Sequence, residues 1–161
     1  MASADFLLMI DGIKGESQQD KHKDEIEVES FSWGATQSGS FGAGGGGGAG
    51  KVNFQDLHFT SRVGKHSPLM VKACATGQHI KKAVLTVRKS GGSQEEYYKV
   101  TLEDLLVSSY QSGGSEGSSA LPVDQFALNF AKIEFAYCPQ KPDGKLDAPV
   151  IFKYSLKESK S

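Results

Sequence analysis

Residues 125–137 read QFALNFAKIEFAY, and their apolar side chains change face halfway along the stretch. From Phe126 to Phe130 they lie at even positions, whereas from Ile133 to Tyr137 they lie at odd ones. Such alternation is typical of a β-strand, but in a flat sheet this change would turn half of the apolar side chains into water. The stretch therefore predicts a strand bent by a β-bulge or a sharp coil, as in curved and closed sheets.

The same change of face recurs in other stretches with β character. It separates Ile26 and Val28 from Phe31 and Trp33, Phe54 from Leu57 and Phe59, and Val100 and Leu102 from Leu105 and Val107. Turn residues join seven β stretches, which cover roughly 5–13, 25–36, 52–61, 80–89, 96–110, 125–137 and 150–157. We therefore predict a mainly β fold, an antiparallel two-sheet β-barrel or tightly curled sandwich.

One short helix is predicted at residues 67–77. Ser67 suits an N-cap, Pro68 the first helical position, and Gly77 the position just past the helix end. The apolar residues of one helix face would be Leu69, Met70, Ala73 and Cys74. We expect this face to cover an open end or side of the barrel.

Length and charge limit the classes of function. A chain of 161 residues fits a single domain that spans 1–161. Its 18 basic and 19 acidic residues leave a net charge of −1, so there is no broad electrostatic reason to expect a nucleic-acid partner. The first apolar run, Phe6 to Ile10, is too short for membrane insertion and lacks a basic flank, so we expect no cleaved signal peptide. Cys74 and Cys138 are too few for a disulfide framework.

Residues 38–50, SGSFGAGGGGGAG, are the most unusual segment. Eight of these thirteen residues are glycine, so we expect an extended loop that is mobile unless something outside the monomer holds it. Residues 45–51, GGGGAGK, match the first part of a phosphate-binding P-loop. However, Val52 replaces the serine or threonine that holds magnesium, and a strand is predicted where the motif requires a helix. We therefore favour a plain loop and expect no cofactor.

Other motifs give little support for an enzyme. Residues 113–117, GGSEG, fit the nucleophile elbow of hydrolases around Ser115, but no helix is predicted after them. The histidines are His22, His58, His66 and His79, and their spacing indicates neither a general base nor a zinc site. We expect no catalytic residue and no bound metal.

The triplet Phe31-Ser32-Trp33 places two aromatic side chains on one face of a strand and Ser32 on the other. We expect a core pair of aromatic residues and a serine that faces solvent.

Several motifs together resemble the hemolysin-coregulated protein (Hcp) family. They are Ile13-Lys14-Gly15-Glu16-Ser17, Ser32-Trp33-Gly34, the Gly44 to Gly50 run leading into Lys51-Val52-Asn53, Gln55-Asp56-Leu57, Leu85-Thr86-Val87-Arg88-Lys89, Leu106-Val107-Ser108-Ser109, Leu128-Asn129-Phe130-Ala131 and Tyr137-Cys138-Pro139-Gln140. The resemblance extends from the first predicted strand to the last, and Cys138 departs from the family pattern.

The resemblance implies a barrel that assembles as a hexameric ring, with rings stacked into a tube inside a contractile sheath and tipped by a trimeric spike. Small effector proteins would bind in the ring channel, with Ser32 as the candidate contact. The candidate contact between neighbouring subunits or stacked rings is the glycine loop, namely Gly42, Gly44, Gly45, Gly46, Gly47, Gly48, Gly50 and Lys51. Assembly would take place in the bacterial cytoplasm and secretion by the type VI system, with no toxin domain after the barrel.

Two other functions fit the same residues. A phage-type tail tube protein would share the ring-forming barrel, whereas a free secreted protein would bind a host or rival cell without a tube. An enzyme is the more distant alternative, and it would lose activity on substitution of Ser115 or Lys51.

Overall fold

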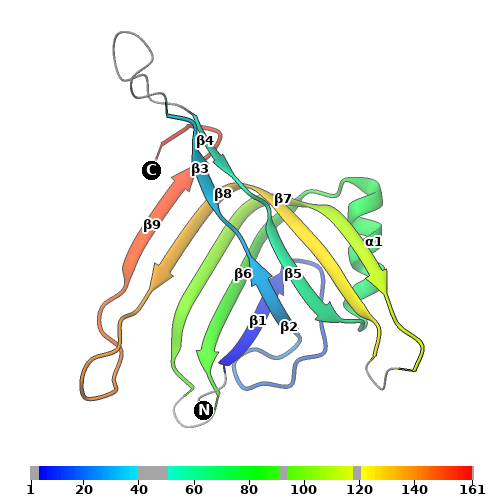
Figure 1. Ribbon diagram of the computed structural model, residues 1–161, viewed down its shortest axis with the longest axis horizontal. Coiled ribbons are helices and arrows are strands. Elements are labelled where there is room, and N and C mark those ends of the chain that lie inside the picture. The colour runs from blue at the N-terminus through cyan, green and yellow to red at the C-terminus, as the bar shows by residue number, and fades with distance from the viewer. Residues whose placement is uncertain (1–3, 40–50, 91–93, 118–120, 161) are drawn as a thin grey trace.

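The computed structural model describes residues 4–39, 51–90, 94–117 and 121–160. This part of the chain contains nine strands and one helix (Figure 1). Their bounds are β1 Ala4–Ile10, β2 Ile26–Ser32, β3 Ala35–Gln37, β4 Val52–Phe54, β5 Leu57–Arg62, α1 His66–Thr76, β6 Ile80–Lys89, β7 Glu96–Gly113, β8 Val123–Tyr137 and β9 Val150–Ser155. Every predicted β stretch contains a strand, but the second and third stretches are each divided into two strands.

Antiparallel pairing closes the main sheet into a barrel. The strand order is β5-β2-β1-β6-β7-β8-β9, and β5 also pairs with β8. Six strands therefore form the closed barrel, and β9 adds to the edge of β8 (Figure 1). Along that edge, residues 123–128 pair with β5 and residues 132–137 pair with β9. The predicted antiparallel barrel with one helix is confirmed, and the second sheet is the short pair β3–β4.

A β-bulge accounts for the change of face predicted in β2, and a second bulge lies on β7 beyond the change predicted between Leu102 and Leu105. The pairing register shifts between Val28 and Ser30 on β2, and again between Val107 and Ser109 on β7. An extra residue in one strand bends it and increases its twist, so apolar residues on both sides of the bulge can point into the same core.

A further irregularity lies where β7 and β8 face each other. Asp104 has a positive φ of 52°, which aspartate tolerates better than most residues, and the register places it opposite Ala131. Phe130 and Ile133, on either side of Ala131, are both buried although they differ in parity. The change of face in residues 125–137 therefore coincides with a local bend shared by two paired strands.

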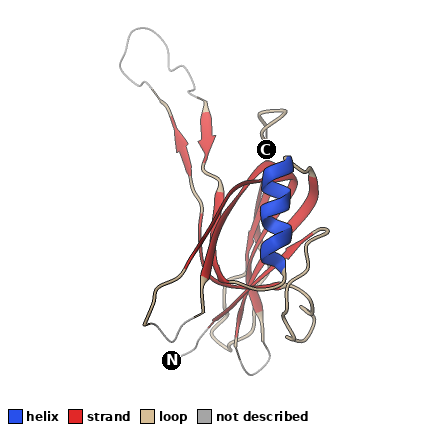
Figure 2. Cartoon of the chain, turned by 90° about the vertical axis from the view of Figure 1, so that its right-hand side faces the viewer, coloured by secondary structure: helices blue, strands red, loops and turns tan. Residues whose placement is uncertain are grey.

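Helix α1 lies along the side of the barrel (Figure 2). Met70 and Ala73 are fully buried, and Gly77 ends the helix with a φ of 62°. Two details of the predicted helix were wrong. Leu69 is 43% exposed rather than buried. Lys65 occupies the N-cap position, and Ser67 lies inside the first turn, where its hydroxyl donates to Asp124 and accepts from the Gly64 amide.

Strands β3 and β4 form a separate two-stranded β3–β4 ribbon. Ala35 pairs with Phe54 and Gln37 with Val52, and within the described residues neither strand pairs with any other. The ribbon extends away from the barrel (Figures 1 and 2). Because a two-stranded hairpin is marginally stable by itself, contacts at the ribbon's base must hold its position.

Candidate functional site

A hollow on the outer face of the barrel collects polar side chains. Strand pairing aligns Ser32 of β2, His58 of β5, Ala127 of β8 and Ser109 of β7 in one row. Directly paired residues in adjacent strands share a face of the sheet, so these side chains all point outward.

His58 and Ser109 of this row line the hollow together with Phe59, Tyr110 and Phe126, while Ser32 lies beside it, and a second row of polar residues also borders it. The second row consists of Thr60, Gln125 and Gln111, and the hollow has a volume of about 440 Å³. Apart from His58, the outward side chains in these two rows carry neutral groups, and the hydroxyl and amide groups among them both donate and accept hydrogen bonds. This chemistry suits recognition of a polypeptide through hydrogen bonds better than recognition of a charged ligand.

Ser32 lies where the sequence predicted. It is exposed, whereas Phe31 and Trp33 are partly buried and pack against the core. The predicted orientation of the triplet is therefore confirmed, while an effector contact at Ser32 stays a prediction.

Most of the predicted contact loop lies outside the described residues. This applies to Gly42, Gly44, Gly45, Gly46, Gly47, Gly48 and Gly50. Lys51 is described and exposed, and its carbonyl oxygen accepts a hydrogen bond of 3.3 Å from the Ser38 hydroxyl. Strand β4 begins at Val52, so the helix that a P-loop requires does not follow Lys51.

Strand β9 presents apolar side chains to solvent. Val150 is 69% exposed and Ile151 is 51% exposed, and Phe152 is also exposed. Among the described strands β9 pairs only with β8, and on its other edge Ser155 forms a bridge with Lys160, so Val150, Ile151 and Phe152 lie on a stretch of that edge that no described strand covers. An apolar edge strand of this kind is a ready surface for association with another chain.

A buried polar network joins α1 to the barrel. Asp124 is fully buried and accepts hydrogen bonds from the Ser67 hydroxyl and, at 2.6 Å, from the Tyr110 hydroxyl. His66 Nε2 lies 3.2 Å from the Ser61 hydroxyl and 3.5 Å from Asp124 Oδ2. Burial lowers the pKa of His66, and the nearby carboxylates of Asp124 and Glu16 only partly oppose this effect.

This network was not predicted from the sequence, because the spacing of the histidines gives no sign that His66 lies close to Ser61 and Asp124. It contains serine, histidine and aspartate, but Ser61 and Asp124 approach the same imidazole nitrogen. A catalytic relay requires the two partners to contact opposite nitrogens of the ring, and it requires a serine that the substrate can reach. We therefore assign this network a structural role.

Comparison with known proteins decides the family of the chain. Residues 7–137 match the family model described as "Type VI secretion system effector, Hcp". The chain belongs to the Hcp family. It is 45% identical over 159 residues to Protein hcp1 of Pseudomonas aeruginosa strain PAO1, with 98% of each chain covered.

Solved structures with Hcp-type folds support the same assignment. A structure titled "Structure of a type six secretion system protein" has a TM-score of 0.92 and 28% identity, and covers 98% of this chain and 99% of its own. Hcp1 from Salmonella typhimurium has a TM-score of 0.79 and 33% identity, with the same coverage. The similarity extends over nearly the whole length of this Hcp chain.

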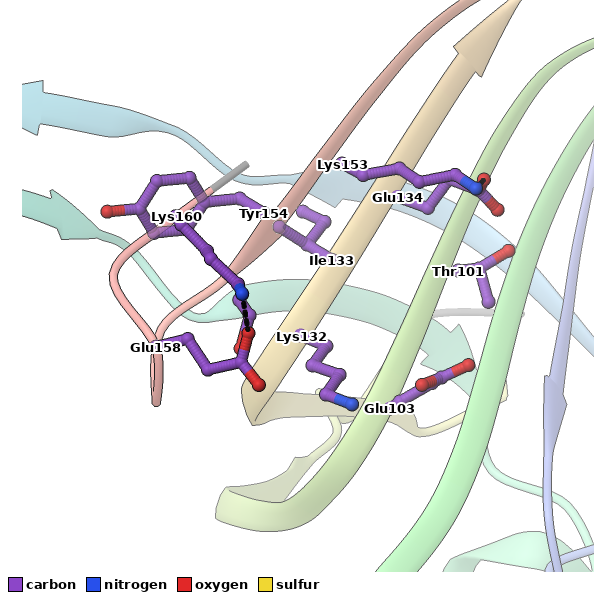
Figure 3. Close-up of a pocket in the computed structure, with 10 residues that line it drawn as sticks. Thr101, Glu103, Lys132, Ile133, Glu134, Lys153, Tyr154, Glu158 and Lys160 are labelled. Carbon is purple, nitrogen blue, oxygen red and sulfur yellow. Dashed lines mark ion pairs between the residues drawn. The ribbon is translucent and has the colours of Figure 1, made fainter.

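A second hollow of the Hcp barrel lies across β7, β8 and β9 (Figure 3). It has a volume of about 330 Å³, and charged residues of both signs line it. Lys153 Nζ lies 3.4 Å from Glu134 Oε1, and Lys160 Nζ lies 3.1 Å from Glu158 Oε2. These exposed pairs contribute little to stability, and they form a mixed-charge surface without a directed arrangement of acid and base.

The described part of this Hcp chain gives little basis for other chemistry. In residues 4–39, 51–90, 94–117 and 121–160, no cluster of three or more His, Cys, Asp or Glu side chains is placed to hold a metal ion. Cys74 and Cys138 are free and half-buried. Ser115 is exposed after the end of β7. No described helix is long and apolar enough to span a membrane.

Proposed function

We propose that this chain is the subunit of a type VI secretion tube. Copies of the barrel close into a hexameric ring, and rings stack into a conduit that a contractile sheath surrounds and a trimeric spike tips. Family membership supports the secretion system, and the apolar surface of β9 supports association of the chain with itself.

The observation that carries ring formation is the exposed edge of β9. If a neighbouring copy covered β9, the apolar side chains of Val150, Ile151 and Phe152 would be removed from water. Each square ångström of apolar surface buried in this way stabilises the interface by roughly 25 cal/mol, before the free-energy cost of association is subtracted. An interface between two different patches of the same chain forms a closed ring when its rotation closes. Strand β9 would supply one of these patches.

Two further features support a conduit. The β3–β4 ribbon projects from the barrel. The segment that joins its two strands in the sequence, with Lys51 and the glycines from Gly42 to Gly50, is the proposed contact with a neighbouring subunit or the next ring. The neutral hollow beside Ser32 is the proposed contact with small effector proteins. Assembly takes place in the bacterial cytoplasm before the protein is secreted by the machine itself.

The native mass of the purified protein tests the ring. Light scattering should give about six times 17.2 kDa, and electron microscopy of the same fraction should show annular particles. A monomer at all concentrations would remove the channel and would favour a free secreted binding protein instead.

A matched pair of variants tests the role of β9. Ile151→Asp should shift the mass toward that of the monomer, because a charge in an apolar interface is costly to bury. Lys81→Asp, on the exposed face of β6, should leave the ring intact. Intact rings in Ile151→Asp would show that β9 is not the interface.

A further inference from the structure

The base of the β3–β4 ribbon brings together four motifs that are distant in the sequence. The ribbon leaves the barrel through two short connections, Trp33-Gly34 and Gln55-Asp56. The first belongs to the motif Ser32-Trp33-Gly34 and the second to Gln55-Asp56-Leu57. The other two motifs, Leu106-Val107-Ser108-Ser109 and Leu128-Asn129-Phe130-Ala131, lie on β7 and β8 and contact Asp56 through one residue each.

Asp56 joins the ribbon to both of these strands. Its Oδ2 accepts a hydrogen bond of 2.7 Å from the Ser108 hydroxyl, and its Oδ1 accepts one of 2.8 Å from Asn129 Nδ2. Ser108 is the residue at which the register of β7 shifts, and a bulge turns a side chain in a direction that regular pairing would not allow. An ionised carboxylate only accepts hydrogen bonds, so it matches two donors that approach from different strands.

Trp33 fixes the other connection of the ribbon. Its indole Nε1 donates a hydrogen bond of 2.8 Å to the Tyr98 hydroxyl, and its ring meets that of Phe135 edge to face at 5.3 Å. The two connections are also joined to each other, since the backbone N–H of Gln55 donates a hydrogen bond of 2.8 Å to the Gly34 carbonyl. The base of the ribbon is therefore attached to the barrel on both of its sides.

Aromatic packing adds a third contact between ribbon and barrel. The Phe54 ring lies 5.3 Å from that of Tyr154 on β9 and 6.1 Å from that of Phe130 on β8. These contacts surround the base, whereas the exposed residues of β3 have no such support. The ribbon's direction is thus set at its base.

We propose that Asp56 and Trp33 act as a clasp that fixes the direction in which the ribbon leaves the barrel, and that Asp56 is a positioning residue for contact between rings. This inference rests on the proposed function, because a ribbon that reaches the next ring must arrive at a defined place. A ribbon that moved freely would lose conformational entropy when assembly ordered it. The clasp lowers this cost, because it restricts the ribbon before assembly begins.

Hydrogen exchange measured by mass spectrometry tests the clasp directly. In Asp56→Ala, amides of residues 35–37 and 52–54 should exchange about tenfold faster, since two side-chain hydrogen bonds that oppose opening of the ribbon base are lost. Exchange in β6 should be unchanged. Asp11→Ala is the control: it changes an exposed aspartate whose backbone amide donates to the Lys82 carbonyl, a bond that the substitution keeps, so this protein should behave like the unaltered one.

Assembly is measured on the same proteins. Asp56→Ala should retain the mass of the ring while sedimentation and electron microscopy show several-fold fewer stacked rings. Made in the unaltered protein, Ser108→Ala should increase the rate of amide hydrogen exchange in the ribbon. Made in the Asp56→Ala protein, it should cause no further increase, because both changes break the same hydrogen bond. A purely structural role of Asp56 would instead lower the stability of the whole barrel or dissolve the ring.

The outcomes separate this inference from the proposed function. If the unaltered protein forms no ring, the proposed function fails, and exchange in the ribbon still decides whether the clasp exists. Unchanged ribbon exchange in Asp56→Ala would overturn the clasp. Faster exchange with unchanged stacking, or a loss of global stability, would overturn its positioning role.

Discussion

Each of the six barrel strands is paired along both of its edges, whereas each strand of the β3–β4 ribbon has a single partner and three residues. The barrel encloses a buried apolar core, and the ribbon leaves most of its side chains exposed. The two regions therefore have different roles. The free energy of folding resides in the barrel, while the ribbon's contribution depends on what it meets outside the monomer.

The largest effect is expected at the buried network of the barrel. Asp124→Ala should lower the free energy of unfolding by about 3 kcal/mol, because the Ser67 and Tyr110 hydroxyls lose their acceptor. Urea unfolding followed by circular dichroism measures this change. Asp143→Ala is the control and should have a much smaller effect, because this carboxylate accepts its hydrogen bond from the Lys145 amide at an exposed turn, where water can replace it. An equal effect of the two changes would show that the network does not hold α1 to the barrel.

Two valines give a matched comparison between barrel and ribbon. Val100→Ala, at a fully buried position of β7, should cost about 2 kcal/mol, because it leaves a cavity in the core. Val52→Ala in the ribbon should change the free energy of unfolding by less than about 0.5 kcal/mol. The same urea titration compares both, and similar values would contradict the division of roles between the two regions.

A smaller effect is expected from pH. Burial holds the pKa of folded His66 below its ordinary value of 6.5, so the unfolded chain binds a proton near this pH before the folded one does. Stability should therefore fall as the pH drops below about 6.5, by at most about 1.4 kcal/mol per pH unit from this residue. His66→Gln should flatten the dependence, and His58→Gln, at an exposed position, should not. Identical slopes in both variants would exclude His66 as the cause.

Much of the barrel could be predicted because local patterns determine it. The changes of face around Phe126 to Tyr137 and around Ile26 to Trp33 predicted bends that the structure contains. The division of the third stretch was not predicted, because the change of face between Phe54 and Leu57 was interpreted as a bend within one strand, whereas β4 ends at Phe54 and β5 begins at Leu57. The Phe54 ring packs beside Phe130 and Tyr154, so it remains partly buried and resembles a barrel residue in the sequence.

The buried network and the clasp could not be predicted, since their partners are far apart along the chain. Ser67 meets Asp124, and Asp56 meets Ser108 and Asn129, only after the strands have paired. Ser67, which the sequence suggested as a helix cap, lies inside the first turn instead, where its hydroxyl bonds to Asp124 and to the Gly64 amide. Ser32 was predictable because its orientation depends only on the parity of one strand.

The divided edge of β8 also bears on how the protein is synthesised. Because β5 covers the first half of that edge, closure of the barrel requires nothing beyond Tyr137. The residues that match the family model, 7–137, therefore include nearly all of the residues that form the closed barrel. On a ribosome, domains fold as units while later residues are still being added. The strand most prone to associate with other chains is thus translated after every strand of the barrel, whose closure does not depend on it.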